Sequence, residues 1–220
     1  MLDNKQTIPN SEINASVCPP GLLETFQRCG RALFHGGLNN SHSGNLSVYD
    51  GTTIWITRTG AMLHELGPLD MVGTSLVPAE GVRPRLSAEF IVHAGIYAAL
   101  GHKAVVHCHP LWSVALGMVE DEIIPLQIDG YGLLPGRIPV LEVSNASGSP
   151  ELTKAVVALL SDVPAVVVRG HGTFVVGSDL EQATHRSFVV ENSSQIICTV
   201  RGLGGDLSEL RTRPYVVSGY

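Results

Sequence analysis

The chain has 220 residues, of which 44% are hydrophobic and 15% are charged, and it carries a formal net charge of −6. This length fits one domain with a sizeable core, and the negative charge without any basic cluster argues against a nucleic-acid partner. The mean hydropathy of +0.21 indicates a sparsely charged surface, which favours burial of apolar surface between subunits.

The chain ends and the cysteines indicate a cytoplasmic protein. The polar N-terminus lacks the basic start and apolar core of a signal peptide, and the apolar runs are shorter than the ~20 residues of a membrane span, so no membrane contact is expected. Scattered cysteines without a Cys-x-x-Cys motif are typical of reduced thiols; they are Cys18, Cys29, Cys108 and Cys198. We expect a flexible N-terminal arm over residues 1–18, one domain over 19–205 and a C-terminal tail over 206–220.

The first half of the chain predicts two helices and three strands. A helix opens at Pro19-Pro20 and ends at Gly36-Gly37, where glycine terminates the apolar stripe. After a polar loop over 38–45, Asp50-Gly51 separates two β-rich runs within Leu46–Thr57, which signals a hairpin. A short strand is expected over Met71–Val77, and Ser87 is the expected N-cap of a helix that runs to Ala99.

The second half predicts further alternation of strands and helices. Ser149-Pro150 is a favourable N-cap and first-turn pair, and Ser178 with Glu181 forms a capping-box pattern. The expected elements are a strand over 104–109, a helix over 112–118, strands over Ile123–Ile128 and Ile138–Val143, a helix over 150–161, strands over Ala165–Arg169 and Thr173–Val176, and a last helix to about Val200.

Helices and strands interleave along the whole length without a repeat or a linker. This pattern predicts a single α/β domain with three layers, in which helices cover both faces of a central sheet. Because hairpins and short links join several of the strands, we expect the sheet to be mixed and mostly antiparallel.

The segment VVHCHP places His107 and His109 two residues apart at the end of an apolar strand. Side chains alternate along a strand, so both imidazoles leave by one face and Cys108 leaves by the other. Two neighbouring imidazoles suit a metal ion that accepts both lone pairs, such as zinc. His171 lies between two glycines at the exit of another apolar strand, and three histidines with an open position are typical of catalytic zinc.

A carboxylate stands close to this pattern in the sequence. Glu89 is expected in the first turn of the helix that precedes the His-x-His strand, where it can act as a base or simply stabilise the helix dipole, an effect of about 0.3–1 kcal/mol. His93 shares its helix face four residues later and is expected to be packed rather than ligating. Among the other histidines, which have no partner pattern, His42 stands apart because its polar loop can line the site.

Five segments together resemble the class II aldolase/adducin family: SGNLSV, WITRTG, LSAEFIVH, AVVHCHP and VVRGHGTFVVG, in this order between about residues 20 and 200. Within the family, the similarity is closest to fuculose-1-phosphate aldolase and its archaeal-type relatives. The resemblance implies an αβα domain, a zinc or similar divalent ion, and a homotetramer with sites at the subunit interfaces.

The resemblance also implies roles for single residues. His107, His109 and His171 match the zinc ligands, and Glu89 matches a carboxylate that ligates the resting metal and then serves as acid and base. The substrate-phosphate pocket corresponds to Gly44, Asn45, Thr59, Gly60 and Ser87. Tyr131 lies two residues from the position of the family's proton-donating tyrosine. Two departures stand out: Ala88 replaces a frequent serine, and Arg58 replaces a frequent proline, where it can compensate or contact a different anion such as a carboxylate.

The implied activity is reversible aldol cleavage of a ketose 1-phosphate, similar to fuculose 1-phosphate, into dihydroxyacetone phosphate and an aldehyde. Decarboxylation, epimerisation and dehydration of a sugar phosphate pass through the same kind of enediolate and remain alternatives, although the epimerases typically carry Asp at the position of Glu89. A non-enzymatic adducin-like binding module is disfavoured, because a scaffold has no need to keep three histidines and a carboxylate together.

Overall fold

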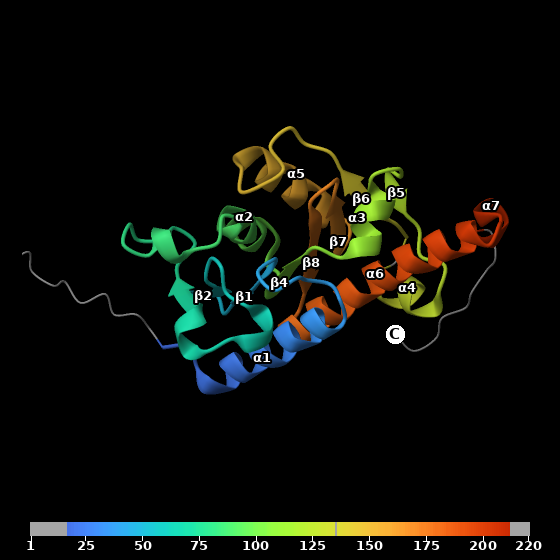
Figure 1. Ribbon diagram of the computed structural model, residues 1–220. Coiled ribbons are helices and arrows are strands. Elements are labelled where there is room, and N and C mark those ends of the chain that lie inside the picture. The colour runs from blue at the N-terminus through green and yellow to red at the C-terminus, as the bar shows by residue number, and fades with distance from the viewer. Residues whose placement is uncertain (1–16, 135, 212–220) are drawn as a thin grey trace, which may run out of the picture.

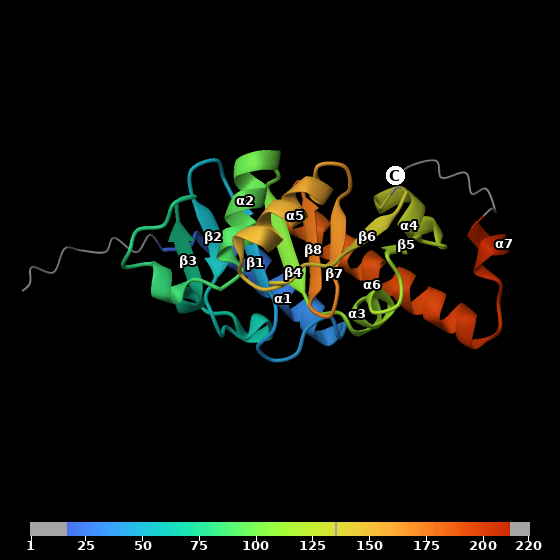
Figure 2. The same cartoon turned by 90° about the horizontal axis from the view of Figure 1, so that it is seen from above.

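An eight-stranded sheet forms the centre of the computed structural model, which describes residues 17–134 and 136–211 (Figure 1). The strands are β1 (Asn45–Tyr49), β2 (Ile54–Thr57), β3 (Met71–Thr74), β4 (Ala104–Cys108), β5 (Glu122–Ile123), β6 (Ile138–Leu141), β7 (Ala165–Val168) and β8 (Gly172–Gly177). Their order is β3-β2-β1-β4-β8-β7-β6-β5, as Figure 2 shows from left to right. Among the strands of the described residues, β6 and β7 are the one parallel pair, so the predicted mixed, mostly antiparallel sheet is confirmed.

Helices cover both faces of this sheet. They are α1 (Pro20–His35), α2 (Phe90–Leu100), α3 (Leu111–Gly117), α4 (Ile128–Leu133), α5 (Pro150–Leu160), α6 (Leu180–Gly202) and α7 (Leu207–Arg211), with 3-10 turns η1 (Leu63–Glu65), η2 (Pro68–Asp70) and η3 (Arg83–Arg85). α2 and α5 lie over one face, and α1 and α6 lie over the other (Figure 1). The predicted αβα arrangement is therefore confirmed.

Strand alternation divides the core between these two faces. Val105 of β4 packs in the layer beneath α2 and α5, whereas its neighbours Ala104 and Val106 pack beneath α1 and α6. A third cluster lies between α6, α3 and the β5–β7 end of the sheet. Buried aliphatic side chains on both faces explain why the central strands read as continuous apolar runs.

The register brings several segments together at one end of the central strands. Asn45 at the start of β1 pairs with His107 near the end of β4, and Cys108 pairs with Thr173 at the start of β8. β2 runs antiparallel to β1, so Arg58, which follows the last residue of β2, lies at the same end of the strands. Segments that are more than 100 residues apart in the sequence therefore converge around His107.

Most of the predicted elements are confirmed. The hairpin of β1 and β2, the helix α1 and the strands β4, β7 and β8 occur where the sequence predicts them. The Ser149 side chain accepts a hydrogen bond from the Leu152 N–H at 2.9 Å, which confirms it as the N-cap of α5. The expected strand Met71–Val77 ends earlier, at Thr74.

The predicted strand Ile123–Ile128 is wrong beyond its first residue. β5 ends at Ile123, and residues 128–133 form α4, so Tyr131 lies on a helix and not on a strand-linking loop. Pro125 has no N–H to donate to a strand ladder. The side-chain amide of Gln127 instead donates to Ser193 Oγ at 2.8 Å and ties the start of α4 to α6.

Two predicted helix caps are displaced. Ser87 is not the N-cap of α2, because Glu89 directly precedes the first helical residue. The Ser87 hydroxyl accepts hydrogen bonds from the Asn45 amide at 3.0 Å and from the Glu89 N–H at 3.3 Å. At α6 the cap is Asp179, which accepts from the Gln182 N–H at 2.7 Å, and not Ser178.

The ends of the chain are only partly described. Residues 1–16 of the expected arm and 212–220 of the expected tail, including Tyr215 and Tyr220, lie outside the described residues, while Cys18 is buried against the core. Within the expected tail, residues 207–211 form the short helix α7. Within the described ranges, the four cysteines are free thiols, and no helix has the length and apolar character that crossing a membrane requires.

Candidate active site

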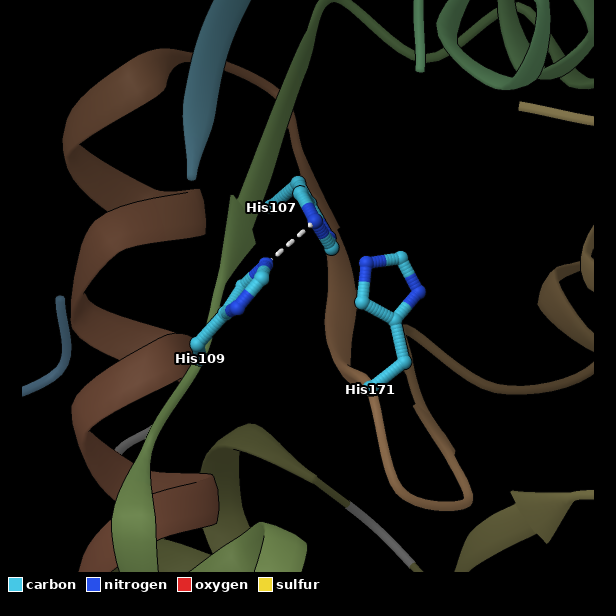
Figure 3. Close-up of side chains that lie close together, drawn as sticks. All are labelled: His107, His109 and His171. Carbon is cyan, nitrogen blue, oxygen red and sulfur yellow. Dashed lines mark hydrogen bonds between the residues drawn. The ribbon is translucent and has the colours of Figure 1, made fainter. Parts of the chain in front are cut away.

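Three histidines converge where β4 ends and β8 begins (Figure 3). His107 and His109 leave β4 on the same side, as strand alternation predicts, and their Nε2 atoms lie 3.0 Å apart. His171 comes from the turn between β7 and β8, and its ring centroid lies 4.8 Å from that of His107 and 5.0 Å from that of His109. One ligand atom from each ring falls within 4.8 Å of the others, so the triad could hold a metal ion.

Burial keeps two of these imidazoles neutral. It lowers the pKa of His107 well below the usual value, and the neighbouring His109 and His171 add to the effect. Burial, with a smaller contribution from His171, lowers the pKa of His109 to about 4. Neutral imidazole is the form that ligates metals.

Hydrogen bonding determines which ring nitrogen of His107 carries the lone pair. His107 Nδ1 lies 2.9 Å from the Thr173 carbonyl oxygen, which can only accept, so the proton sits on Nδ1 and the Nε2 lone pair faces His109. His171 Nδ1 is buried and has no hydrogen-bond partner among the described residues. A cation fits this donor set, because the Nε2 atoms of His107 and His109 lie 3.0 Å apart and neutral imidazoles can turn their lone pairs toward one ion.

The backbone at Gly172 approaches the end of β4 closely, and this approach allows the triad to form. A Cβ at this position would lie 2.3 Å from the Cys108 carbonyl oxygen and 3.0 Å from His109 Cδ2. Any side chain here would push the β7–β8 turn, and His171 with it, away from β4. The two glycines that flank His171 therefore have different roles. Gly172 allows the close approach to β4, and Gly170 adopts the positive φ of 71° that the turn requires.

Glu89 lies beside the triad. Its side chain is only 6% exposed, and its Oε1 is 3.9 Å from His171 Nε2. The Ser147 hydroxyl donates to Oε1 at 2.8 Å, and the Gly148 N–H contacts both carboxylate oxygens at 3.1 and 3.2 Å. This loop before α5 has no signal in the sequence that connects it to Glu89, and only the tertiary structure reveals the contact.

A cavity of about 210 Å³ unites the triad with the polar loops. Its lining contains every predicted metal and phosphate residue together with three further ones: His42, Ser43, Gly44, Asn45, Arg58, Thr59, Gly60, Ser87, Ala88, Glu89, His107, His109 and His171. Two larger hollows of about 480 Å³ lie elsewhere, but within the described part of the chain this triad is the only group of three side chains that could hold a metal ion.

Two of the predicted site residues need separate comment. The Arg58 guanidinium lines the cavity, but it pairs with Asp70 at 2.8 Å and donates to the Thr59 carbonyl at 2.9 Å, so its charge is already balanced. Tyr131 is not among the residues that line the cavity, since α4 packs against α6 near the far end of the sheet (Figure 2). His42, left open by the sequence, does line it.

Comparison with known proteins places this arrangement in a family. The family described as "Class II Aldolase and Adducin N-terminal domain" matches residues 24–198. The chain belongs to this family. The prediction from the sequence motifs is thereby confirmed, and so is the prediction of an enzyme of the class II aldolase type.

Individual members of the family carry different activities. The crystal structure of L-fuculose-1-phosphate aldolase from Thermus thermophilus is similar with a TM-score of 0.79 and 30% identity, covering 89% of this chain and 98% of that one. The 3-oxo-tetronate 4-phosphate decarboxylase of Escherichia coli K12 is 28% identical over 206 residues, which are 87% of this chain and 95% of that protein.

A third relative is a larger protein. The probable bifunctional methylthioribose-1-phosphate isomerase/methylthioribulose-1-phosphate dehydratase of Nocardia farcinica is 30% identical over 184 residues, which are 76% of this chain and 33% of that protein. The chain thus spans about a third of it. Because the names of these class II aldolase relatives describe an aldolase, a decarboxylase and a dehydratase, family membership leaves the individual reaction open.

Proposed function

We propose that this chain is a zinc-dependent aldolase that reversibly cleaves a ketose 1-phosphate, of the fuculose 1-phosphate type, into dihydroxyacetone phosphate and an aldehyde. The observation that carries the proposal is the single cavity in which the histidine triad, Glu89 and the polar segments 43–45 and 58–60 meet. The likeness to the Thermus thermophilus aldolase over 98% of its chain supports the same reaction.

The histidine triad is the proposed holder of the metal, with Glu89 as a fourth group in the resting enzyme. A zinc ion at this place supplies Lewis-acid stabilisation of the negative charge that develops on the substrate oxygens. The residues fit such an ion because His107 and His109 are neutral and face one another through their Nε2 atoms. The Thr173 carbonyl orients His107 in the manner common for metal-ligating histidines.

Glu89 is the proposed acid and base at carbon. In the cleavage direction it gives a proton to the carbon released from the broken carbon–carbon bond, and in synthesis it removes that proton. The hydroxyl of Ser147 and the N–H of Gly148 hold the carboxylate at a fixed place near His171. Such proton transfer by a positioned side chain typically contributes roughly 10²–10⁴-fold in rate.

The substrate phosphate is proposed to bind the polar side of the cavity. Asn45 and Ser87 contact each other at 3.0 Å there, and Gly44, Thr59 and Gly60 complete the wall. Backbone N–H groups, hydroxyls and an amide can hold a phosphate without a lysine, and the N-terminal end of α2 adds a favourable dipole. Arg58 contributes less than its charge suggests, because Asp70 neutralises it.

The donor at the aldehyde oxygen is proposed to be Tyr131 of a neighbouring copy within a homotetramer. Tyr131 lies outside the cavity of its own chain, so a site completed at a subunit interface would account for its role. Large apolar side chains remain exposed on α3 and α4 and in the link after α3, as expected of a surface that another copy covers: Leu111, Trp112, Met118, Val119 and Ile128.

Decarboxylation of a phosphorylated oxo-acid is the second candidate. The likeness to the Escherichia coli decarboxylase extends over 95% of that protein, which favours this candidate over the dehydratase. Loss of CO₂ beside a carbonyl leaves the same negative charge as aldol cleavage, and Glu89 would again return a proton to carbon. The two reactions therefore need the same residues and differ in the bond that breaks.

One experiment separates these reactions. The zinc-loaded protein is incubated with dihydroxyacetone phosphate and a panel of aldehydes, and in parallel with 3-oxo-tetronate 4-phosphate, with the Glu89→Gln protein as a matched control. We expect a ketose 1-phosphate in the first incubation only. Release of CO₂ without formation of a ketose phosphate would replace the aldolase by a decarboxylase, and neither product from zinc-loaded protein would refute both.

A further inference from the structure

A buried polar cluster joins β1 to α2 within an otherwise apolar layer. Ser47 of β1 is completely buried, and its Oγ lies 2.6 Å from His93 Nδ1 and 2.6 Å from the Tyr97 hydroxyl. His93 is also completely buried, and Tyr97 is 3% exposed. Ser47 and His93 fall within the segments SGNLSV and LSAEFIVH, and Tyr97 follows the second of these, but none of the three has a role among the predicted metal or phosphate residues.

The hydrogen bonds of the cluster do not satisfy all of its members. Burial lowers the pKa of His93 to about 3, so the ring is neutral and carries one N–H. If Nδ1 donates to Ser47, the serine donates to Tyr97 and the Nε2 lone pair is left over; if Ser47 donates to Nδ1, the Nε2 hydrogen is left over. In either case His93 Nε2 is a buried group with no partner in the described part of the chain.

Such a group is costly, and a layer that only had to be filled would contain apolar side chains here. Directional hydrogen bonds do what apolar packing does not, because they select one register between two elements. The cluster therefore calls for an explanation in terms of what it holds in place.

The positions of the three residues connect them to the candidate site. Ser47 lies two residues from Asn45, on the same face of β1. His93 and Tyr97 follow Glu89 at intervals of four residues, so all three lie on one side of the helix. Asn45 itself contacts Ser87, just before Glu89, at 3.0 Å. Two polar contacts thus join β1 to the α2 segment, one on each side of Glu89.

We propose that His93, with Ser47 and Tyr97, is a positioning residue that fixes the height and rotation of α2 along β1 and so places the Glu89 carboxylate beside the histidine triad. The contact that depends on this placement is the 3.9 Å approach of Glu89 Oε1 to His171 Nε2. The ring of Phe174 extends the same layer, since it stacks on His107 at 4.4 Å and meets His93 edge-on at 6.1 Å. This inference rests on the proposed function in assuming that Glu89 and the triad act on one metal.

The test uses variants that remove single members of the cluster from the full-length protein. Ser47→Ala removes the central hydroxyl, Tyr97→Phe removes one hydroxyl and keeps the ring, and His93→Gln keeps an amide near Nε2. Thr184→Val is the matched control, because it removes a buried hydroxyl on α6, which donates to Leu180 at 2.7 Å on the opposite face of the sheet.

Cobalt(II), which replaces zinc in such sites and absorbs visible light, reports the ligand arrangement without any knowledge of the substrate. We expect Ser47→Ala and Tyr97→Phe to change the cobalt spectrum and to weaken zinc binding, measured by chelator competition, by roughly 10-fold, as for other groups that orient metal ligands. Where turnover can be measured, kcat should fall while KM stays unchanged. Thr184→Val should lower the unfolding temperature without either change.

The outcomes separate this inference from the proposed reaction. If the three cluster variants lower the unfolding temperature but keep the wild-type cobalt spectrum and zinc affinity, the cluster is only structural and the inference is wrong. If the wild type binds cobalt, and the cluster variants differ from it in cobalt spectrum and zinc affinity as expected, but the wild type makes no ketose phosphate, then the aldolase proposal fails while the positioning role stands. A wild-type protein that binds no cobalt or zinc would overturn both.

Discussion

His107 donates its Nδ1 hydrogen to the carbonyl oxygen of Thr173 at 2.9 Å, across the antiparallel pair of β4 and β8. This single bond sets the tautomer of the ring and turns the Nε2 lone pair toward His109. A backbone carbonyl in a sheet cannot move away, so the orientation of the most buried histidine of the triad is built into the strand pairing.

Metal content follows from this geometry. We expect about one zinc or similar divalent ion per chain, and we expect His107→Ala and His171→Ala to lose it because fewer than three imidazoles remain. Elemental analysis of the purified and reconstituted proteins measures the effect. His185→Ala, on an exposed part of α6, is the control and should retain the metal. Unchanged metal content in both triad variants would refute the metal site.

Glu89→Gln tests whether the carboxylate acts as a base. Glutamine can still accept the hydrogen bond from Ser147 but has no charge and no basicity. If Glu89 only stabilised the helix dipole, stability would fall by at most ~1 kcal/mol with normal turnover. Loss of a general base predicts a decrease of roughly 10²–10⁴-fold.

The measurement is proton exchange at the hydroxymethyl carbon of dihydroxyacetone phosphate, which requires no knowledge of the aldehyde. Zinc affinity is measured alongside, so that loss of a metal ligand is not mistaken for loss of the base. Near-wild-type exchange in a zinc-replete Glu89→Gln protein would rule out the proposed role.

Asn45→Ala and Ser87→Ala should weaken binding of the phosphorylated substrate without removing the metal. Hydrogen bonds to a charged group contribute about 1.5–3 kcal/mol, so each change should raise KM by roughly 10- to 100-fold. Because the two side chains contact each other, the double variant should lose less than the sum. Equal processing of a phosphorylated substrate and its unphosphorylated counterpart would contradict a phosphate site.

The metal-free protein should lose stability in acid. Burial lowers the pKa of His93 from 6.5 to about 3 and that of His109 from 6.5 to about 4. At a pH between the unfolded pKa of 6.5 and the lowered folded pKa, each of these histidines binds a proton in the unfolded chain but not in the folded one. The free energy of unfolding therefore falls as the pH drops below about 6.5. For the fully enclosed His93 the loss is roughly 1 kcal/mol per pH unit.

Denaturant unfolding of the metal-free protein between pH 7 and pH 4 measures this loss. Zinc should oppose it, because a bound cation competes with protons for the neutral histidines. A free energy of unfolding that stays constant over this range would show that the buried histidines are not held neutral.

A shared active site can be detected by mixing two inactive variants. If Tyr131 serves the cavity of a neighbouring copy, Glu89→Gln and Tyr131→Phe proteins that exchange subunits should recover up to about a quarter of the wild-type activity, because some interfaces then contain both intact residues. Each variant alone should stay inactive. Full activity of Tyr131→Phe alone would exclude this tyrosine, and loss of activity in His42→Gln would then favour the histidine that lines the cavity.

The sequence by itself determined those features that depend on neighbours along the chain. The side-by-side arrangement of His107 and His109 follows from the alternation of strand side chains, and the start of α5 follows from the capping chemistry of Ser149. Motif order was sufficient for the family. The αβα architecture could be predicted because apolar strands and amphipathic helices alternate without interruption.

Only the tertiary structure decided where competing local preferences ended and which distant residues meet. The run after Ile123 had strand composition, but Pro125 cannot donate to a strand ladder, residues 124–127 form no strand, and α4 begins at Ile128, with Gln127 bonded to α6 and Tyr131 outside the cavity lining. Ser87 lies two residues before the start of α2, and its hydroxyl accepts from the amide of Asn45, 42 residues earlier, as well as from the Glu89 N–H. The support of Glu89 by Ser147 and Gly148 joins residues nearly 60 positions apart. Contacts of this kind arise from strand order and layer packing, and no local pattern encodes them.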